Sequence, residues 1–342
     1  MRILYVTVGD ASNPGSHYRV YAHLPFLRSL GYEVSVLSPL RRRPGRAGSR
    51  LWRVLDLLRA AARAGSADLV VLYRVTLPRP FDRLLRRRAR VLVFEYDDAI
   101  WLPAPAEPQD AATAARYEAN FAATLAVADF VVAGNEMLAA RAADVLAEVV
   151  PTAVDVARFT PATTAGSRPG FVVGWVGTAE NQLEWRRLAP AFRAVVEARP
   201  EVRLKVVSDR PPADLGLPVE FERWSLAREA AALDDFDVGI MPLDDTPWNR
   251  GKCSIKALQC MAMARPAVLS PVGMNRDVVR AGADGYFAGS SEEWVAHLLE
   301  LAADRRLTAA LGCSARDRVA ASFSLEAVAP RLEAALRRAV GR

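Results

Sequence analysis

Two lysines and a serine stand near the start of a predicted helix, where they could bind an anion. The stretch 251–273 reads GKCSIKALQCMAMARPAVLSPVG, and its apolar residues recur at helical spacing until Arg265-Pro266 ends the pattern. Ser254 stands where an N-cap is expected, with Lys252 before it and Lys256 in the first turn. The first N–H groups of a helix lack partners within the helix and carry partial positive charge. The sequence therefore predicts a site suited to a phosphate.

Three acids follow one another closely in the segment EYDDAIW. Glu95 and Asp97 would share one face of a predicted strand over 91–96, and Asp98 would begin the next loop. Asp97 or Asp98 could bind hydroxyl groups or act as a general base, because a positioned carboxylate can accept a proton. Two alternatives stay open: an aspartate could cap a helix, and a carboxylate pair could hold a metal-bound diphosphate.

A third group, Gly15, Ser16 and Arg19, forms a G-S-x-x-R run after the first predicted strand. An arginine at that place could donate two parallel hydrogen bonds to a phosphate. The alternative is a turn glycine followed by an arginine on the surface of a helix. The run is not a G-x-G-x-x-G fingerprint, which argues against a dinucleotide-dependent dehydrogenase.

Alternating strands and helices must position these residues, and this alternation predicts parallel sheets. In the first half, strands are predicted over 2–8, 33–37, 68–73, 91–96 and 130–133, with helices over 18–30, 51–64, 81–89, 111–127 and 135–146. In the second half, strands are predicted over 171–176, 203–207, 219–222, 237–241 and 267–269, with helices over 183–198, 291–304 and 324–340. Ligands of open parallel sheets bind at the carboxyl ends of the strands.

The carboxyl ends of the later strands carry candidate nucleotide-binding residues. These are Gly177, Thr178, Asp209, Trp224 and Ser225. The indole of Trp224 could lie against a base, and core packing is the equal alternative.

Three segments of the chain resemble the retaining GT-B glycosyltransferases of family 4. LQCMAMARPAVLSPVG resembles the LEAMACGxPVVASxxGG block of that family, PTAVDVARFTP resembles its NGVDxxRFxP linker, and the last helix resembles its FSWExxAxxLxxxY tail. The resemblance implies an α/β fold with two Rossmann-like domains facing each other across a cleft. It implies an acceptor domain over 1–155, a nucleotide-sugar donor domain over 156–323, and a helix over 324–342 that packs back on the first domain.

The resemblance also assigns roles to the candidate residues. Together with the strand ends and the helix start described above, it leads us to expect donor contacts by Gly15, Ser16, Arg19, Gly177, Thr178, Asp209, Trp224, Ser225, Ser254, Lys256 and Gln259, and catalytic roles for Asp97, Asp98 and Lys252. The chain departs from the family at four positions. Gly251 and Gln259 replace two glutamates, and Thr178 and Leu183 replace an arginine and a lysine. Lys252 and Lys256 are then the nearest cations that could neutralise a diphosphate.

The composition limits the class of protein. The chain has 342 residues, which indicates two domains, and 51% of them are hydrophobic. Three cysteines and three histidines are too few for a disulfide framework or a structural metal site, so we expect a cytoplasmic protein without a bound metal or other cofactor. The start MRILYVTVGD is expected to be a strand and not a signal peptide, and no apolar run is long enough to span a membrane.

Arginines gather in two segments, which bears on possible partners. Arg41, Arg42, Arg43 and Arg46 precede a predicted helix whose Leu51, Trp52, Leu55 and Leu58 form an apolar stripe. This region could dock on anionic lipid and reach a lipid-linked acceptor, although core packing of the stripe is the main alternative. No nucleic-acid-binding motif is present, and the arginines lack interleaved aromatic residues, so nucleic acid is not expected as a partner.

Taken together, these features predict a transferase that moves a sugar from a nucleotide-diphosphate sugar to a glycan, a lipid-linked or a small-molecule acceptor, as in polysaccharide biosynthesis. Retention of configuration and metal independence follow from the resemblance alone. Two alternatives stay open: a non-hydrolysing nucleotide-sugar epimerase of the same fold, and a degenerate protein that binds nucleotide or glycan without transfer.

Overall fold

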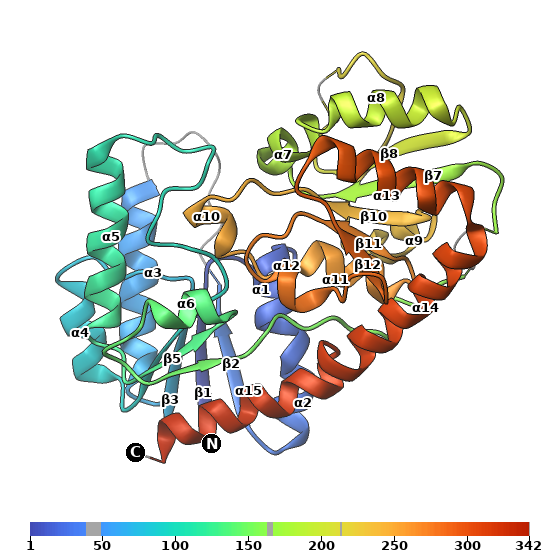
Figure 1. Ribbon diagram of the computed structural model, residues 1–342. Coiled ribbons are helices and arrows are strands. Elements are labelled where there is room, and N and C mark those ends of the chain that lie inside the picture. Colours follow the sequence, from blue (N-terminus) through green and yellow to red (C-terminus); the bar gives the residue numbers. More distant parts are fainter. Residues whose placement is uncertain (39–48, 163–166, 213, 342) are drawn as a thin grey trace. The chain divides into compact units, whose positions relative to one another are not determined.

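The chain forms two compact units, each built on a parallel six-stranded sheet (Figure 1). The computed structural model describes residues 1–38, 49–162, 167–212 and 214–341, and the side chains of 49–53 lie outside this description. The first unit comprises Met1–Ala153 and Val328–Arg342, and the second comprises Val154–Ala327. The division thus falls two residues before the predicted boundary at 155/156.

The sheet of the first unit has the order β2-β1-β3-β4-β5-β6. Its strands are β1 (Arg2–Thr7), β2 (Glu33–Leu37), β3 (Leu69–Tyr73), β4 (Leu92–Tyr96), β5 (Phe130–Ala133) and β6 (Ala147–Val149). Every residue of β3, β4 and β5 is buried, as expected for parallel strands covered on both faces. Figure 1 shows α3 (Ser49–Ala64), α4 (Phe81–Arg88) and α5 (Ala111–Leu125) on one side of this sheet. On the other side lie α1 (Pro14–Arg19) and α2 (Leu24–Ser29).

Two predicted helices are broken into shorter ones, in both cases near a proline. In place of one helix over 18–30, the chain forms α1, a 3₁₀ turn (Tyr21–His23) and α2, and a proline stands at the start of both α-helices. In place of one helix over 183–198, it forms α7 (Gln182–Arg186) and α8 (Ala189–Ala198), and α8 again has a proline in its first turn. Proline is favoured in the first turn of a helix, where its missing N–H has no partner to lose.

Several elements were not predicted from the sequence. The region predicted as one helix over 135–146 holds the short helix α6 (Glu136–Ala140), and the edge strand β6 follows it. In the second unit, α9 (Glu229–Asp234) and α14 (Arg305–Ser322) were also missed. α9 is only six residues long, and α14 buries a narrow face of mostly small residues, so neither has a strong apolar pattern.

The sheet of the second unit has the order β12-β11-β10-β7-β8-β9. Its strands are β7 (Phe171–Val176), β8 (Val202–Ser208), β9 (Val219–Arg223), β10 (Val238–Met241), β11 (Ala267–Leu269) and β12 (Gly285–Phe287). In Figure 1, α7, α8 and α13 (Ser291–Ala303) lie on one side of this sheet, with α9, α11 (Ile255–Ala262) and α14 on the other. The remaining short helices are α10 (Pro247–Arg250) and α12 (Asn275–Val278).

The core of the second unit is rich in aromatic side chains. The rings of Trp175 and Trp185 stack with centroids 6.4 Å apart, and Phe192 lies 4.7 Å from Trp185. Two glycines let neighbouring side chains approach the sheet closely. A Cβ atom on Gly239 would lie 2.5 Å from Cys260 of α11, and one on Gly174 would lie 2.1 Å from the ring of Phe236.

The last helix, α15 (Leu325–Val340), belongs to the first unit from Val328 onward. Arg331 donates to the carbonyl of Val149 over 3.1 Å, and Arg338 pairs with Glu148 at 3.0 Å. Both contacts fasten the helix to the edge strand β6. Among the described residues, no helix combines the length and the apolar character needed to cross a membrane.

Candidate functional site

The strand order places a topological switch point in each sheet. In the second unit β7 and β10 are neighbours, and the chain leaves them in opposite directions, toward β8 and toward β11. In the first unit the corresponding pair is β1 and β3. Ligands of open α/β sheets bind outside the carboxyl ends of the strands at such a point.

In the second unit, the loop after β7 is held by side-chain hydrogen bonds. The backbone N–H of Ala179 donates to Asp209 Oδ1 over 2.7 Å, and Asn181 Nδ2 donates to Thr178 Oγ1 over 2.8 Å. Asp209 follows β8, the neighbouring strand, so it fixes this loop from the side. Thr178 and Asp209 therefore shape the loop at the carboxyl edge of the sheet, where they were predicted to contact the donor.

Two ammonium groups reach the same loop from the segment around the start of α11. Lys252 Nζ donates to Asn181 Oδ1 over 2.9 Å. Lys256 Nζ lies 5.1 Å from the ring centre of Trp175. A Cβ atom on Gly177 would lie 2.7 Å from Lys256 Nζ. The absence of a side chain at Gly177 thus makes room for the ammonium group. The structure brings Gly177, Lys252, Lys256 and the N-terminus of α11 together beside one loop.

The prediction that the side chain of Ser254 caps the helix is wrong. The residue occupies the N-cap position of α11, but its side chain makes no capping hydrogen bond. Its backbone is left-handed, with φ at 54°, and its hydroxyl donates instead to Asn275 Oδ1 over 2.7 Å. The hydroxyl is buried by this contact. Ser254 therefore joins α11 to α12 and is not placed to bind a donor through its side chain.

Gln259 and Trp224 share a buried carboxylate that sequence reasoning missed. Gln259 Nε2 donates to Glu229 Oε1 over 2.8 Å, and Trp224 Nε1 donates to the same oxygen over 2.9 Å. Arg158 pairs with the other oxygen of Glu229 at 3.1 Å. Gln259 is 3% exposed, so its amide stabilises the interior, which corrects its assignment as a direct donor contact. Ser225, next to Trp224, accepts a hydrogen bond from Arg228 N through its carbonyl, over 3.1 Å.

Glu184 of α7 is a second residue that the sequence did not reveal. Its Oε1 accepts from Asn249 Nδ2 over 2.6 Å, and its Oε2 accepts from the backbone N–H of Asp244 over 3.0 Å. These bonds tie α7 to the loop after β10, which is the other strand of the switch point. No motif distinguishes Glu184 from an ordinary surface acid of a helix.

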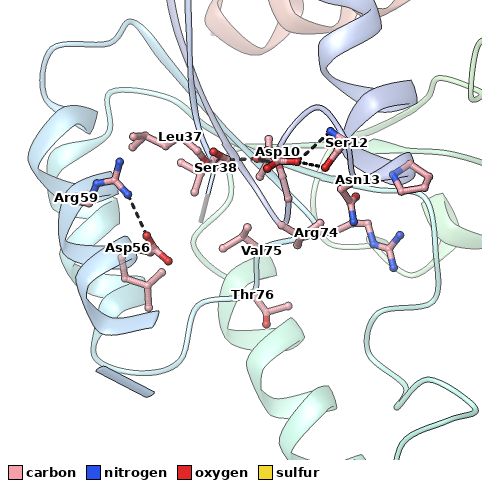
Figure 2. A pocket seen from close by; sticks show the side chains of 16 residues that line it. Asp10, Ser12, Asn13, Leu37, Ser38, Asp56, Arg59, Arg74, Val75 and Thr76 are labelled. Carbon is pink, nitrogen blue, oxygen red and sulfur yellow. Dashed lines mark hydrogen bonds and ion pairs between the residues drawn. The ribbon is translucent and has the colours of Figure 1, made fainter. Parts of the chain in front are cut away.

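In the first unit, a pocket of about 650 Å³ opens at the carboxyl ends of β1, β2 and β3 (Figure 2). The loop after β1, the end of β2, the segment after β3 and one face of α3 form its walls. Its polar lining consists of Thr7, Asp10, Ser12, Asn13, Ser38, Asp56, Arg59, Arg74 and Thr76. The pocket therefore lies at the switch point between β1 and β3.

The two aspartates that were predicted to be catalytic meet an arginine that was not predicted. Arg74 NH1 lies 2.9 Å from Asp98 Oδ2 and 3.7 Å from Asp97 Oδ1. The hydroxyl of Tyr73 donates to Asp97 Oδ1 over 2.9 Å, and burial raises the pKa of Asp97. A Cβ atom on Gly15 would lie 2.8 Å from the Tyr73 hydroxyl and 3.4 Å from Arg74 NH1. The structure thus brings Gly15, Asp97 and Asp98 together, and Arg74 links them to the pocket.

Arg19 corrects another prediction, because its guanidinium group lies inside the first unit. It is 1% exposed and donates to Glu95 Oε1 over 3.0 Å and to the carbonyl of Val150 over 2.7 Å. An arginine in this position stabilises the interior and does not face a phosphate. Burial raises the pKa of Glu95 to about 7, although the Arg19 guanidinium lowers it. Ser16, also buried, donates its backbone N–H to Asn13 Oδ1 over 3.0 Å, which caps α1.

The predicted membrane-docking segment is largely outside the described part of the chain. Arg41, Arg42, Arg43 and Arg46 fall in the range 39–48, and the side chains of Leu51 and Trp52 are not described either. Of the remaining apolar stripe, Leu55 is half-buried and Leu58 is exposed. Within the residues that the structure describes, no three His, Cys, Asp or Glu side chains are grouped so that they could hold a metal ion.

Comparisons with known proteins agree with this architecture. Residues 170–304 match the model of the family described as "Glycosyl transferases group 1", and no curated protein matches the chain. Sucrose-phosphate synthase from Thermosynechococcus elongatus has a similar structure, with a TM-score of 0.75 at 16% identity, over 99% of this chain and 98% of that one. HepE from Anabaena, solved with UDP-glucose, gives a TM-score of 0.71 at 16% identity, over 99% of this chain and 100% of that one. A glycosyltransferase from Rickettsia africae gives 0.68 at 12% identity, over 99% and 98% of the two chains.

These likenesses define the class of fold. The two parallel six-stranded sheets, with helices on both faces, are those of the GT-B glycosyltransferases, so the predicted fold class is confirmed. The match of residues 170–304 lies wholly within the second unit, which carries a domain of the group 1 glycosyltransferase type. The loop after β7 and the two lysines that reach it belong to this domain.

Proposed function

We propose that the protein transfers a glycosyl group from a nucleotide-diphosphate sugar to a hydroxyl group of an acceptor. The convergence of Lys252 and Lys256 on the loop after β7 carries this proposal, because it provides two cations beside a helix N-terminus at a switch point. The pattern lies within the residues that match the group 1 glycosyltransferases. HepE, which is similar in fold, has been solved with UDP and with UDP-glucose.

In this reaction the bond between the anomeric carbon and the diphosphate oxygen breaks, and an acceptor oxygen forms a new bond to that carbon. The departing diphosphate carries the electron pair and gains negative charge. Lys252, Lys256 and the first N–H groups of α11 would stabilise that charge, since preorganised donors and cations lower such barriers. The acceptor hydroxyl loses a proton, for which Asp97 or Asp98 would be the base. Retention of configuration and independence of a metal ion belong to the proposal through the family resemblance.

The lysine content of the chain offers a direct test of the donor site. The sequence contains three lysines, Lys205, Lys252 and Lys256. Lys205 pairs with Glu222 at 2.8 Å and with Asp235 at 2.6 Å, so it serves as an internal control. In protein labelled with ¹³C at the lysine side chains, UDP and UDP-glucose should shift the signals of Lys252 and Lys256 and leave that of Lys205 unchanged. Lysine-to-arginine variants would assign the three signals.

If neither UDP, other nucleoside diphosphates nor their sugars shift Lys252 or Lys256, the donor site is not where we place it. If binding occurs but no donor is consumed with a broad acceptor panel, the protein binds without transfer. The cytoplasmic location and the contact with anionic membrane remain part of the proposal. Cell fractionation, and flotation with anionic liposomes at low and physiological salt, would test them.

A further inference from the structure

The outer face of α4 and the residues just after it present four arginines that have no acidic partner in the described part of the chain. These α4 arginines are Arg83, Arg87, Arg88 and Arg90. All four are exposed, and within the described ranges their guanidinium groups form no hydrogen bond or ion pair. The single acid of α4, Asp82, is buried. The residues outside the description include no aspartate or glutamate, so they supply no acidic side chain either.

This arrangement of charge weakens the isolated helix. Arg83 and Arg87 stand one turn apart, and like charges at this spacing repel each other. Arg83 also lies in the first turn of α4, where the positive end of the helix dipole disfavours a cation. The dipole favours Arg87 and Arg88 in the last turn, so it accounts for only part of the cluster. A partner that brings negative charge would relieve the repulsion.

Exposed apolar side chains lie on the neighbouring helix. α3 packs against α4, and Figure 1 shows both helices on the same side of the sheet, so their exposed faces point away from it. On α3, the side chains of Val54 and Leu58 stand one turn apart and are 36% and 46% exposed. Cations beside exposed apolar side chains are typical of helices that lie at the interface of an anionic bilayer. There the guanidinium groups bind headgroup phosphates, and the apolar side chains enter the acyl boundary.

A bilayer fits this surface better than a nucleic acid does. Proteins that bind single-stranded nucleic acid place aromatic rings among their cations, because the bases stack on them. The one aromatic side chain of α4, Phe81, is half-buried. Against a nucleic acid the side chains of Val54 and Leu58 would gain nothing, whereas a bilayer removes them from water.

We propose that the outer faces of α3 and α4 dock on an anionic lipid bilayer, with the α4 arginines on headgroup phosphates and with Val54 and Leu58 in the acyl boundary. The inference rests on the part of the proposed function that brings the protein to a membrane, and it assigns that contact to described residues. A lipid-linked acceptor would then be reached while it stays in the bilayer.

Flotation with vesicles of two compositions tests the charge requirement. The full chain should float with vesicles of phosphatidylcholine and phosphatidylglycerol in equal parts, stay behind with pure phosphatidylcholine, and be released by high salt. Arg83→Gln combined with Arg87→Gln should lower the partition coefficient about 30-fold, since each arginine at an anionic surface contributes about fivefold. Arg193→Gln combined with Arg306→Gln is the matched control, because it removes the same charge from exposed positions of the second unit and should change nothing.

A leucine variant tests the apolar part of the surface. Leu58→Ser should lower the partition coefficient about three- to tenfold, because part of a leucine side chain no longer leaves water. Leu146→Ser is the matched control, since Leu146 is an exposed leucine of the same unit beside β6, and it should leave the partition unchanged.

Several results would overturn the proposal. They are no binding to the anionic vesicles, equal binding to the neutral ones, or wild-type partition of the paired arginine variant or of Leu58→Ser in protein that melts like the wild type. Binding of heparin without binding of vesicles would also overturn it. If the paired variant does not fold, Arg87→Gln with Arg88→Gln replaces it. The shifts of the lysine signals with UDP need no lipid, so a failure of the proposed transfer is seen separately.

Discussion

Removing the ammonium group of Lys252 should weaken binding of a nucleoside diphosphate without unfolding the protein. Lys252 is half-buried, and its Nζ lies 2.9 Å from Asn181 Oδ1, at the loop where we place the diphosphate. A hydrogen bond to a charged group contributes about 1.5–3 kcal/mol. Since about 1.4 kcal/mol corresponds to a tenfold change, Lys252→Ala should raise the dissociation constant of UDP by about 10- to 150-fold.

The hydrogen bond from Lys252 to Asn181 allows two roles for the lysine: it could bind the diphosphate directly, or it could hold the loop after β7 in place. Asn181→Ala removes the amide and leaves the ammonium group, so a direct contact predicts a loss of less than about 1 kcal/mol for this variant. A double-mutant cycle with Lys252→Ala gives the coupling between the two side chains. The calorimetric affinity should also fall with added salt in the wild type, and less so in Lys252→Ala, because salt screens a charge–charge contact.

Two outcomes would refute the reasoning. An unchanged affinity for UDP in Lys252→Ala, in protein that melts like the wild type, would remove Lys252 from the site. An equal loss in Asn181→Ala and Lys252→Ala, with no further loss in the double variant, would show that the lysine only shapes the loop. The α11 N-terminus and Lys256 would then be the remaining groups for the diphosphate.

Four further predictions address the two units. Arg19→Met leaves the fully buried Glu95 without its cation and should lower the free energy of unfolding by about 3–5 kcal/mol in urea, whereas the exposed Arg28→Met should change it by less than about 0.5 kcal/mol. The folded pKa of Glu95 is about 7, above its ordinary value of 4.5, so its contribution to stability is greatest below pH 4.5 and is lost as pH rises toward 7. Glu95→Gln should therefore flatten the fall in the free energy of unfolding between pH 4.5 and 7. An unchanged fall in this variant would assign the pH dependence to another group. Gly177→Ala places a Cβ atom 2.7 Å from Lys256 Nζ and should shift the Lys256 signal and weaken UDP binding about tenfold, whereas Gly65→Ala, with its nearest atom at 3.9 Å, should do neither. Asp97→Asn and Asp98→Asn should keep UDP affinity, and at least one should slow transfer by about 10²–10⁴-fold; full activity in both would make the acids structural.

The strands were the part of the fold that the sequence predicted best. The bounds of β2, β5 and β7 agree with the predicted ranges. For β5 and β7 the reason is that each apolar run is bounded by glycine or aspartate, which end a parallel strand abruptly. Helices were predicted less well. Pro190 and Pro25 are visible in the sequence, but whether a proline kinks a helix or starts a new one depends on the packing around it.

The positions of the site residues follow from strand ends, but their partners do not. Arg19 stands in the chain 76 residues before Glu95 and 131 residues before Val150, and its burial depends on both. Ser254 has a sequence typical of an N-cap, yet its left-handed backbone turns the hydroxyl toward Asn275. Arg74 carries no motif, and its strained backbone is evident only in three dimensions. Local sequence patterns predict which edge of the sheet binds a ligand, and long-range packing decides which side chains face that edge.

The four departures from the family pattern form one consistent change in charge. In that pattern two cations follow the first strand of the second domain and two acids stand in the block around the later helix. Here Thr178 and Leu183 carry no charge after β7, and Gly251 and Gln259 carry none in the block. Lys252 and Lys256 instead bring positive charge from the α11 segment to the loop after β7. The carboxyl edge of this sheet thus has two cations, which come from the segment around the start of α11 and not from the loop after β7. At position 259 the amide also suits the interior, because Gln259 Nε2 donates to Glu229 Oε1 and a glutamate there would place two buried carboxylates together.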